Sequence, residues 1–148
     1  IGVGQILNTG VGNYVFAGVS DGGYSSPDEW FAYQGFQNKF RSAVNEQNNQ
    51  STAFSSFSLN TNQFLASIQF LGGSQIDLSI NNNISSTPTS ITSLDLNQEV
   101  DFSAFDNSGS IVVPTETKQQ CVLFWTTDQT ANRTAISGLI NTEYNNIY

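Results

Sequence analysis

The sequence predicts a mainly β protein, folded as a single antiparallel β-sandwich or jelly-roll-like domain over residues 1–148. Three observations favour this fold class. Apolar residues alternate with glycine and polar residues in the opening stretch, two alternating runs flank a Gly-Gly-Ser turn, and further short runs are separated by Asn, Ser, Gly and Pro. The chain is long enough to bury a core without disulfide bonds.

The opening stretch, residues 1–19, alternates apolar side chains with bare glycine backbone. Several glycines on one strand face need a reason, such as the close approach of another backbone or the ability to leave the home sheet. The stretch therefore forms either the first strands of its own sheet or an edge strand exchanged with a neighbouring copy. In the second case the side chains that fill the neighbour's pockets are Ile1, Val3, Leu7 and Val11.

Residues 27–46 carry the pattern of an early α-helix. Ser26 is a capping residue, Pro27 suits the first helical position, and Glu29 completes a capping box. Apolar residues then recur at helical spacing, and the Asn/Gln cluster at 45–50 ends the segment. These apolar residues are Tyr33, Phe36, Phe40 and Val44.

The clearest β signal is a hairpin over residues 64–80, with its turn at 72–74. One strand presents Phe64, Ala66, Ile68 and Phe70 on a single face, and the other presents Ile76, Leu78 and Ile80. We expect residues 81–93 to form a polar loop.

Four segments complete the predicted fold. Residues 94–104 alternate as a strand, and residues 110–113 form a short strand that Pro114 ends. Residues 119–127 are apolar on both faces, which is typical of a central strand. After residue 128, helical spacing predicts a C-terminal helix, and its apolar positions are Ile136, Leu139, Ile140, Tyr144 and Ile147.

The composition excludes several classes of partner. Charged residues are 11% of the chain, against about 25% in ordinary soluble domains, and 17 Asn, 12 Gln, 19 Ser and 13 Thr take their place. The net charge is −8, and the scattered basic residues cannot release counterions from a phosphate backbone or bind an anionic membrane surface. They are Lys39, Arg41, Lys118 and Arg133. No apolar run reaches the roughly 18 residues of a membrane helix. We expect an extracellular, cell-surface or virion-surface protein without nucleic-acid partners or membrane insertion.

The chain lacks the side chains of the common catalytic and metal sites. It contains no histidine, which removes the usual proton shuttle and the commonest metal ligand. Its single cysteine, Cys121, lies in an apolar run and is expected to be a buried free thiol. A glycosidase needs two facing carboxylates, and nothing in the sequence shows that any two of Asp28, Glu29, Asp95, Glu99 and Asp101 face each other. We therefore predict no enzyme, no metal and no cofactor.

One alternating run of oxygen-bearing side chains is a candidate calcium-binding site. Asp95, Asn97, Glu99 and Asp101 lie on one strand face. Such side chains are roughly 7 Å apart and point outward in parallel, so they do not converge on one ion. We prefer a solvated outer face to a calcium site.

Sugar binding is the second functional hypothesis. Exposed rings such as those of Trp30, Trp125, Tyr24, Tyr144 or Tyr148 would pack against sugars while neighbouring amides bind their hydroxyls, although core packing is the commoner role of such rings. Three glycosylation sequons occur, no more than the asparagine content predicts by chance, and their acceptors are Asn49, Asn83 and Asn132.

The leading hypothesis is a non-enzymatic structural subunit that polymerises with copies of itself. Strand addition through Ile1 to Val11 would build a pilus-like filament or a virion coat or decoration shell. On this hypothesis, deleting residues 1–11 abolishes assembly and leaves a folded domain. The alternative is a carbohydrate-binding module or lectin-like surface protein.

Overall fold

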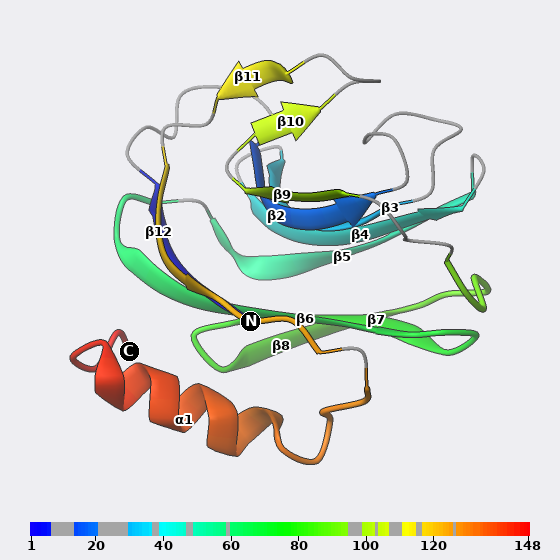
Figure 1. Cartoon of the computed structure of the whole chain (residues 1–148). Helices are drawn as coiled ribbons and strands as arrows, with labels where there is room; N and C mark the ends of the chain where they lie inside the picture. Colours follow the sequence, from blue (N-terminus) through cyan, green and yellow to red (C-terminus); the bar gives the residue numbers. More distant parts are fainter. Residues whose placement is uncertain are drawn as a thin grey trace.

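Two five-stranded antiparallel sheets, a separate two-stranded hairpin and one C-terminal helix make up the computed structural model (Figure 1). The structure describes residues 1–6, 14–20, 30–36, 39–46, 49–58, 60–94, 99–102, 104–106, 111–114, 117–125 and 127–148. The mainly β class and the antiparallel pairing predicted from the sequence are confirmed.

The strands lie in the sheets in a different order from their order along the chain. The first sheet runs β12 (Thr117–Val122), β1 (Gly2–Ile6), β6 (Gln63–Leu71), β7 (Gln75–Ile80) and β8 (Asn83–Pro88). The second runs β5 (Asn49–Ser58), β4 (Lys39–Glu46), β3 (Trp30–Phe36), β2 (Tyr14–Ser20) and β9 (Glu99–Phe102). The hairpin pairs β10 (Ala104–Asp106) with β11 (Ile111–Pro114), and the helix is α1 (Arg133–Glu143).

The main hydrophobic core contains side chains from both sheets. Its members come from β1, β4, β5, β6 and β7 and from the segment after β8. The Phe40 and Phe64 rings meet edge to face in this core, with centroids 4.8 Å apart. The buried members are Ile6, Phe40, Val44, Ala53, Phe64, Ala66, Ile76, Leu78, Ile80 and Ile91.

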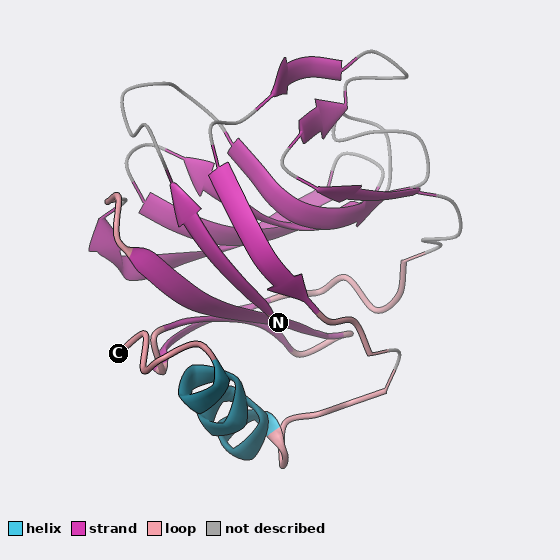
Figure 2. Ribbon diagram, turned by 60° about the vertical axis from the view of Figure 1, so that its left-hand side comes forward, coloured by secondary structure: helices cyan, strands magenta, loops and turns pink. Residues whose placement is uncertain are grey.

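A second, smaller cluster joins α1 to the opposite face of the first sheet (Figure 2). Val3 of β1 and Leu65 of β6 pack there against Ile140 of α1. The strands β1 and β6 are therefore buried on both faces, because Ile6 and Phe64 of the same two strands belong to the main core.

Close packing explains the glycines of β1. A Cβ atom built on Gly4 would lie 2.9 Å from Cζ of Phe64 and 3.2 Å from the carbonyl oxygen of Lys118. A Cβ atom on Gly2 would lie 3.3 Å from the carbonyl oxygen of Cys121. The core ring and the neighbouring β12 backbone thus occupy the space that side chains would need, and the sequence expectation of a close approach is confirmed.

The helix predicted over residues 27–46 is wrong. The strands β3 and β4 pair there from Trp30 opposite Asn45 to Phe36 opposite Lys39. The apolar residues do fit a helical period. However, β2 and β5 flank this hairpin and pair with it, and a helix in its place would leave the facing edges of those two strands without backbone partners. Aromatic side chains also pack well on a pleated surface. The proposed capping residues 26–29 lie outside the described residues.

Residues 81–93 are not wholly a loop, because β8 occupies Asn83–Pro88. Asn81 and Asn82 both have positive φ, at 48° and 67°. This is the conformation that a tight two-residue hairpin turn needs, and asparagine tolerates it better than most residues. The Asn-Asn pair therefore turns the chain back and lets β8 pair with β7.

Two other strand predictions need correction. The single strand expected over 94–104 is divided between β9, which joins the second sheet, and β10, which joins the hairpin. The expected central strand is the edge strand β12, and Leu123, Phe124 and Trp125 beyond it are exposed. The apolar residues 123–125 therefore belong to an exposed segment and not to a strand that is buried on both faces.

The remaining elements agree with the sequence predictions. The hairpin over 64–80 is formed by β6 and β7, with Gly73 at φ 69° in its turn. The strand before Pro114 is β11, and the C-terminal helix is α1.

Candidate functional site

A cavity of about 480 Å³ lies in the first sheet at the beginning of β1. Gly2 pairs with Val122 of β12 on one side and with Ala66 of β6 on the other. Ile1 extends the pairing with the β12 side, since its nitrogen donates to the Leu123 oxygen (2.8 Å) and its oxygen accepts from the Leu123 N–H (2.7 Å). Both flanking segments continue beyond this point and line the cavity, which we call the slot.

The slot is one strand wide. Val122 and Ala66 each lie one strand spacing from Gly2, so their backbones are about 9.6 Å apart. Extending the observed register past Ile1 places Ile68 opposite Phe124, with the slot between them. Figure 1 shows the orange segment after β12 passing the N-terminus before it turns toward α1.

The main-chain groups of alternate β6 residues point into the slot. The Leu65 N–H donates to Asn81 Oδ1 (2.9 Å), and the Leu65 carbonyl accepts from the Asn81 N–H (2.9 Å), so Leu65 faces β7. Neighbouring residues of a strand bond to opposite edges, so Ile68 directs its N–H and C=O away from β7 and toward the slot. Among the described residues, no strand pairs with this edge of β6 beyond Ala66.

The slot has an apolar side and a polar side. Ile68, Phe70, Leu94 and Val122 line it and also pack against the main core. At its rim, 49% of Phe124 and 41% of Trp125 are exposed. Apolar side chains thus form one wall of the slot and part of its rim.

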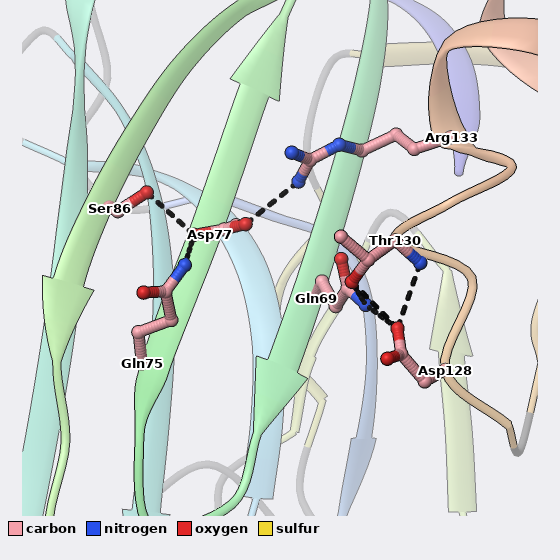
Figure 3. Close-up of polar contacts among 7 residues, drawn as sticks. All are labelled: Gln69, Gln75, Asp77, Ser86, Asp128, Thr130 and Arg133. Atoms are coloured by element: carbon pink, nitrogen blue, oxygen red, sulfur yellow. Dashed lines mark hydrogen bonds and ion pairs between the residues drawn. The ribbon is translucent and has the colours of Figure 1, made fainter.

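The polar side is a small network across the sheet face that carries α1 (Figure 3). Gln69 Nε2 donates to Asp128 Oδ1 (2.5 Å) and to Thr130 Oγ1 (2.7 Å). The side-chain and backbone hydrogen bonds from Thr130, aided by the one from Gln69, hold the pKa of Asp128 below its ordinary value. Asp128 is therefore an ionised acceptor at the mouth of the slot.

A second polar cluster fixes the start of α1 to the sheet (Figure 3). Asp77 Oδ2 accepts from Arg133 Nη1 at 2.8 Å, and Asp77 Oδ1 accepts from Ser86 Oγ (2.6 Å) and Gln75 Nε2 (2.7 Å). Burial raises the pKa of Asp77, but these hydrogen bonds and the Arg133 charge outweigh burial and lower it. Arg133 also lines the slot, so this pair positions one of its walls.

The proposed assembly residues lie in different environments. Ile1 packs at the edge of the α1 cluster, and Val3 is buried within that cluster. Both belong to a segment that pairs on both sides within its own chain. Leu7 and Val11 lie outside the described residues.

The other sequence candidates are not brought together by the described structure. The sequon residues Asn49, Asn83 and Asn132 are exposed at the starts of β5, β8 and α1. Glu99 and Asp101 belong to β9, opposite Ser20 and Gly18. Asp28, Glu29, Asp95 and Asn97 lie outside the described residues. Trp30 is in β3, and Tyr144 and Tyr148 lie at and after the end of α1.

Metal-binding and membrane-spanning features were sought in the described part of the chain. It contains no group of three or more Cys, Asp or Glu side chains arranged to hold a metal ion. Its helical segment does not combine the length and apolar character needed to cross a bilayer. Cys121 is a free thiol, half-buried rather than fully buried, and it packs against the α1 cluster.

Comparison with known proteins adds no assignment. No protein-family model matches the chain, and neither a curated protein nor a solved structure matches it.

The sequence does not predict the slot, because Gln69 lies about 60 residues from Asp128 and Thr130 along the chain. The sequence feature that could have indicated the slot is the apolar stretch Leu123–Trp125, but the same pattern also predicts a buried strand.

Proposed function

We propose that this protein is a non-enzymatic structural subunit of an extracellular or virion assembly, either a pilus-like filament or a coat or decoration protein. Copies of the chain join by edge-strand pairing and apolar burial. We also propose that residues 1–148 form one domain and that its two sheets pack as a β-sandwich or jelly-roll-like fold, consistent with the core they share.

The edge strand β12 and the segment that follows it are the observation that supports this function. Among the described strands β12 pairs with one neighbour, β1, and Leu123, Phe124 and Trp125 beyond it are exposed. Contacts that combine strand pairing with apolar burial hold extended segments on sheet edges.

The structure changes which element is expected to receive the neighbour. The first strand, β1, is interior and carries the buried Val3 and Ile6, so deleting residues 1–11 removes core side chains as well as any donor strand. We therefore place the contact between copies at Leu123, Phe124 and Trp125, the exposed residues that follow β12. A substitution there tests assembly without removing a strand.

The experiment measures the mass of the native protein by light scattering, with negative-stain images of the same sample. We expect large regular particles or fibres from the native chain. Trp125→Asp places a charge at the slot rim, where burial against another copy would desolvate it, and should shift the mass to that of a monomer.

Leu139→Asp is the matched control. Leu139 is 74% exposed on α1 and does not line the slot. We expect this variant to assemble like the native chain. A native protein that stays monomeric at high concentration would overturn the proposed function.

Carbohydrate binding is a second candidate, favoured by the exposed Trp125 ring in the same cavity as the Gln69, Asp128 and Gln129 side chains. A ring face packs on an apolar sugar face while amides and carboxylates bind hydroxyls. Glycan-array binding that Trp125→Ala abolishes and Leu139→Ala preserves would support it. An array without hits would remove it.

A further inference from the structure

We propose that a second cavity, at the end of the first sheet where β6 begins and β7 ends, binds a single neutral sugar ring, either free or at the end of a glycan. The cavity has a volume of about 200 Å³ and shares no lining residue with the slot. We call it the amide cavity. The inference goes beyond the proposed function, because it does not depend on whether copies of the chain assemble.

The lining of the amide cavity has an apolar part and a polar part. Phe40, Phe64 and Ile80 reach it from the main core, and Ile147 adds an apolar side chain from the segment after α1. The polar part consists of amides only, which are Asn60, Asn62, Gln63 and Asn81. Among the described residues that line this cavity none is ionisable, so a charged ligand would lose water without gaining an opposite charge. The lining therefore favours a neutral ligand.

Hydrogen bonds fix the turn that supplies one side of the cavity. The Asn62 N–H donates to Asn60 Oδ1 at 2.8 Å. Gln5 Nε2 of β1 donates to the Thr61 carbonyl oxygen at 2.9 Å, which ties the turn to the first sheet. A main-chain N–H can only donate, so its partner on Asn60 is the oxygen, and Asn60 Nδ2 is left to donate to a ligand.

The amides on the other side are also fixed by their neighbours. Asn81 Oδ1 accepts from the Leu65 N–H at 2.9 Å, and the Asn81 N–H donates to the Leu65 carbonyl oxygen at 2.9 Å. Asn81 Nδ2 is thus a second donor. Gln63 Nε2 donates to Gln120 Oε1, which leaves Gln63 Oε1 as an acceptor. Because these bonds orient the side chains before a ligand arrives, binding costs less conformational entropy.

This set of groups matches the chemistry of a pyranose. A hydroxyl group can accept from an asparagine amide and donate to a glutamine oxygen at the same time. The C–H face of the ring can pack on the apolar part of the lining. The cavity has the volume of about seven waters at about 30 Å³ each, and it is smaller than the pockets of about 300–1,000 Å³ that hold drug-sized ligands. It therefore accepts one ring, and the rest of a glycan would extend outside.

The segment after α1 borders the amide cavity and then turns away from it. The Tyr148 N–H donates to Asn141 Oδ1 at 3.2 Å, and the Tyr148 oxygen accepts from Asn141 Nδ2 at 3.3 Å. Asn141 belongs to α1 and does not line the cavity. Ile147 is therefore held at the cavity by a backbone that is fixed to the helix.

The experiment titrates the full chain with the methyl glycosides of glucose, galactose, mannose and N-acetylglucosamine. Nitrogen-15 NMR follows the side-chain amide signals of Asn60 and Asn81. We expect at least one glycoside to shift both signals in a saturable way. A glycan array with the same rings at the ends of longer chains then shows whether the site binds the ring alone or requires the rest of a glycan.

Two substitutions remove only the groups that the inference assigns to the ligand. Asn60→Asp and Asn81→Asp each keep the Oδ1 acceptor that their own backbone partner needs, and each loses the Nδ2 donor. We expect both variants to unfold near the native melting temperature and to bind the sugar about tenfold or more weakly. Asn49→Asp is the matched control, because it makes the same charge change at an exposed residue outside the cavity. We expect it to bind like the native chain.

Several outcomes would overturn the inference. One is a titration in which no glycoside shifts the Asn60 and Asn81 signals and no array glycan binds. Another is equal affinity of the native chain and the two aspartate variants. Binding that Trp125→Ala abolishes and Asn60→Asp preserves would assign the sugar to the slot instead. Light scattering of the same samples keeps the proposed function separate, because a monomer that binds sugar through Asn60 and Asn81 supports this inference and overturns assembly.

Discussion

Gly4 shows how one missing side chain can determine the packing of a strand. It pairs with Phe64 of β6, and a Cβ there would lie 2.9 Å from Cζ of the Phe64 ring and 3.2 Å from the Lys118 carbonyl oxygen of β12. The glycine therefore permits the buried position of β1. By contrast, a Cβ on Gly138 in α1 would meet nothing within 4 Å.

These two glycines give opposite predictions for alanine substitution. Gly4→Ala should lower the free energy of unfolding by about 1–3 kcal/mol, because it overpacks the core. Gly138→Ala should raise it by up to about 1 kcal/mol, because alanine favours an exposed helix interior. Urea unfolding of the two variants beside the native chain measures both changes. Equal effects of the same sign would contradict the close approach at Gly4.

Asp77 makes stability depend on pH in a defined direction. The pKa of its carboxyl group in the folded protein lies below the ordinary value of 3.8, to which the pKa returns in the unfolded chain. The carboxylate therefore contributes stability that is fully present above about pH 4 and is lost as the pH falls through the lower folded pKa.

The corresponding measurement is the free energy of unfolding in urea between about pH 2 and 6. We expect the native chain to lose stability on acidification more steeply than Asp77→Asn, which cannot titrate at this position. Parallel pH profiles would show that the Arg133, Ser86 and Gln75 contacts do not stabilise the charged carboxylate.

At the scale of elements, α1 presents one narrow face to the first sheet. Ile140 packs against Val3 and Leu65, while the adjacent Leu139 points to solvent. Arg133 fixes the start of the helix through Asp77. The orientation of the helix therefore depends on a few contacts at its start and along one stripe.

Paired substitutions test this orientation. Ile140→Ala should lower the free energy of unfolding by about 2–4 kcal/mol, because it removes a buried side chain and leaves a cavity. Leu139→Ala should change it by less than about 0.5 kcal/mol, because the side chain is exposed. Thermal or urea unfolding followed by circular dichroism reports both values. A larger effect at Leu139 would show that α1 packs through its other face.

On the scale of the whole molecule, β1 connects parts of the chain that are far apart in sequence. It joins β6 to β12 and contributes Val3 and Ile6 to the clusters on the two faces of the sheet. Without it, β12 would have no neighbouring strand among those that the structure describes in the first sheet. We therefore regard β1 as a structural strand of its own sheet.

Deletion of residues 1–6 should abolish cooperative unfolding rather than merely lower stability. Two buried side chains and the ladders on both edges of β1 are lost together. Circular dichroism and calorimetry of the deleted chain, beside a chain lacking only Tyr148, measure this effect. A cooperative transition near the native melting temperature would show that β1 is dispensable and available for exchange.

The sequence by itself determined the elements whose pattern is local. The Gly-Gly-Ser turn and its alternating flanks predict the β6–β7 hairpin, and helical spacing after residue 128 predicts α1. Only tertiary structure decided residues 27–46, where strand partners on both sides outweigh a helical pattern with a capping signal. The slot was likewise decided in three dimensions, because its walls come from β6 and from the segment after β12. Local propensity acts between neighbours in sequence, whereas β1 pairs with β6 and β12, whose residues lie 64 and 120 positions from Gly2 along the chain.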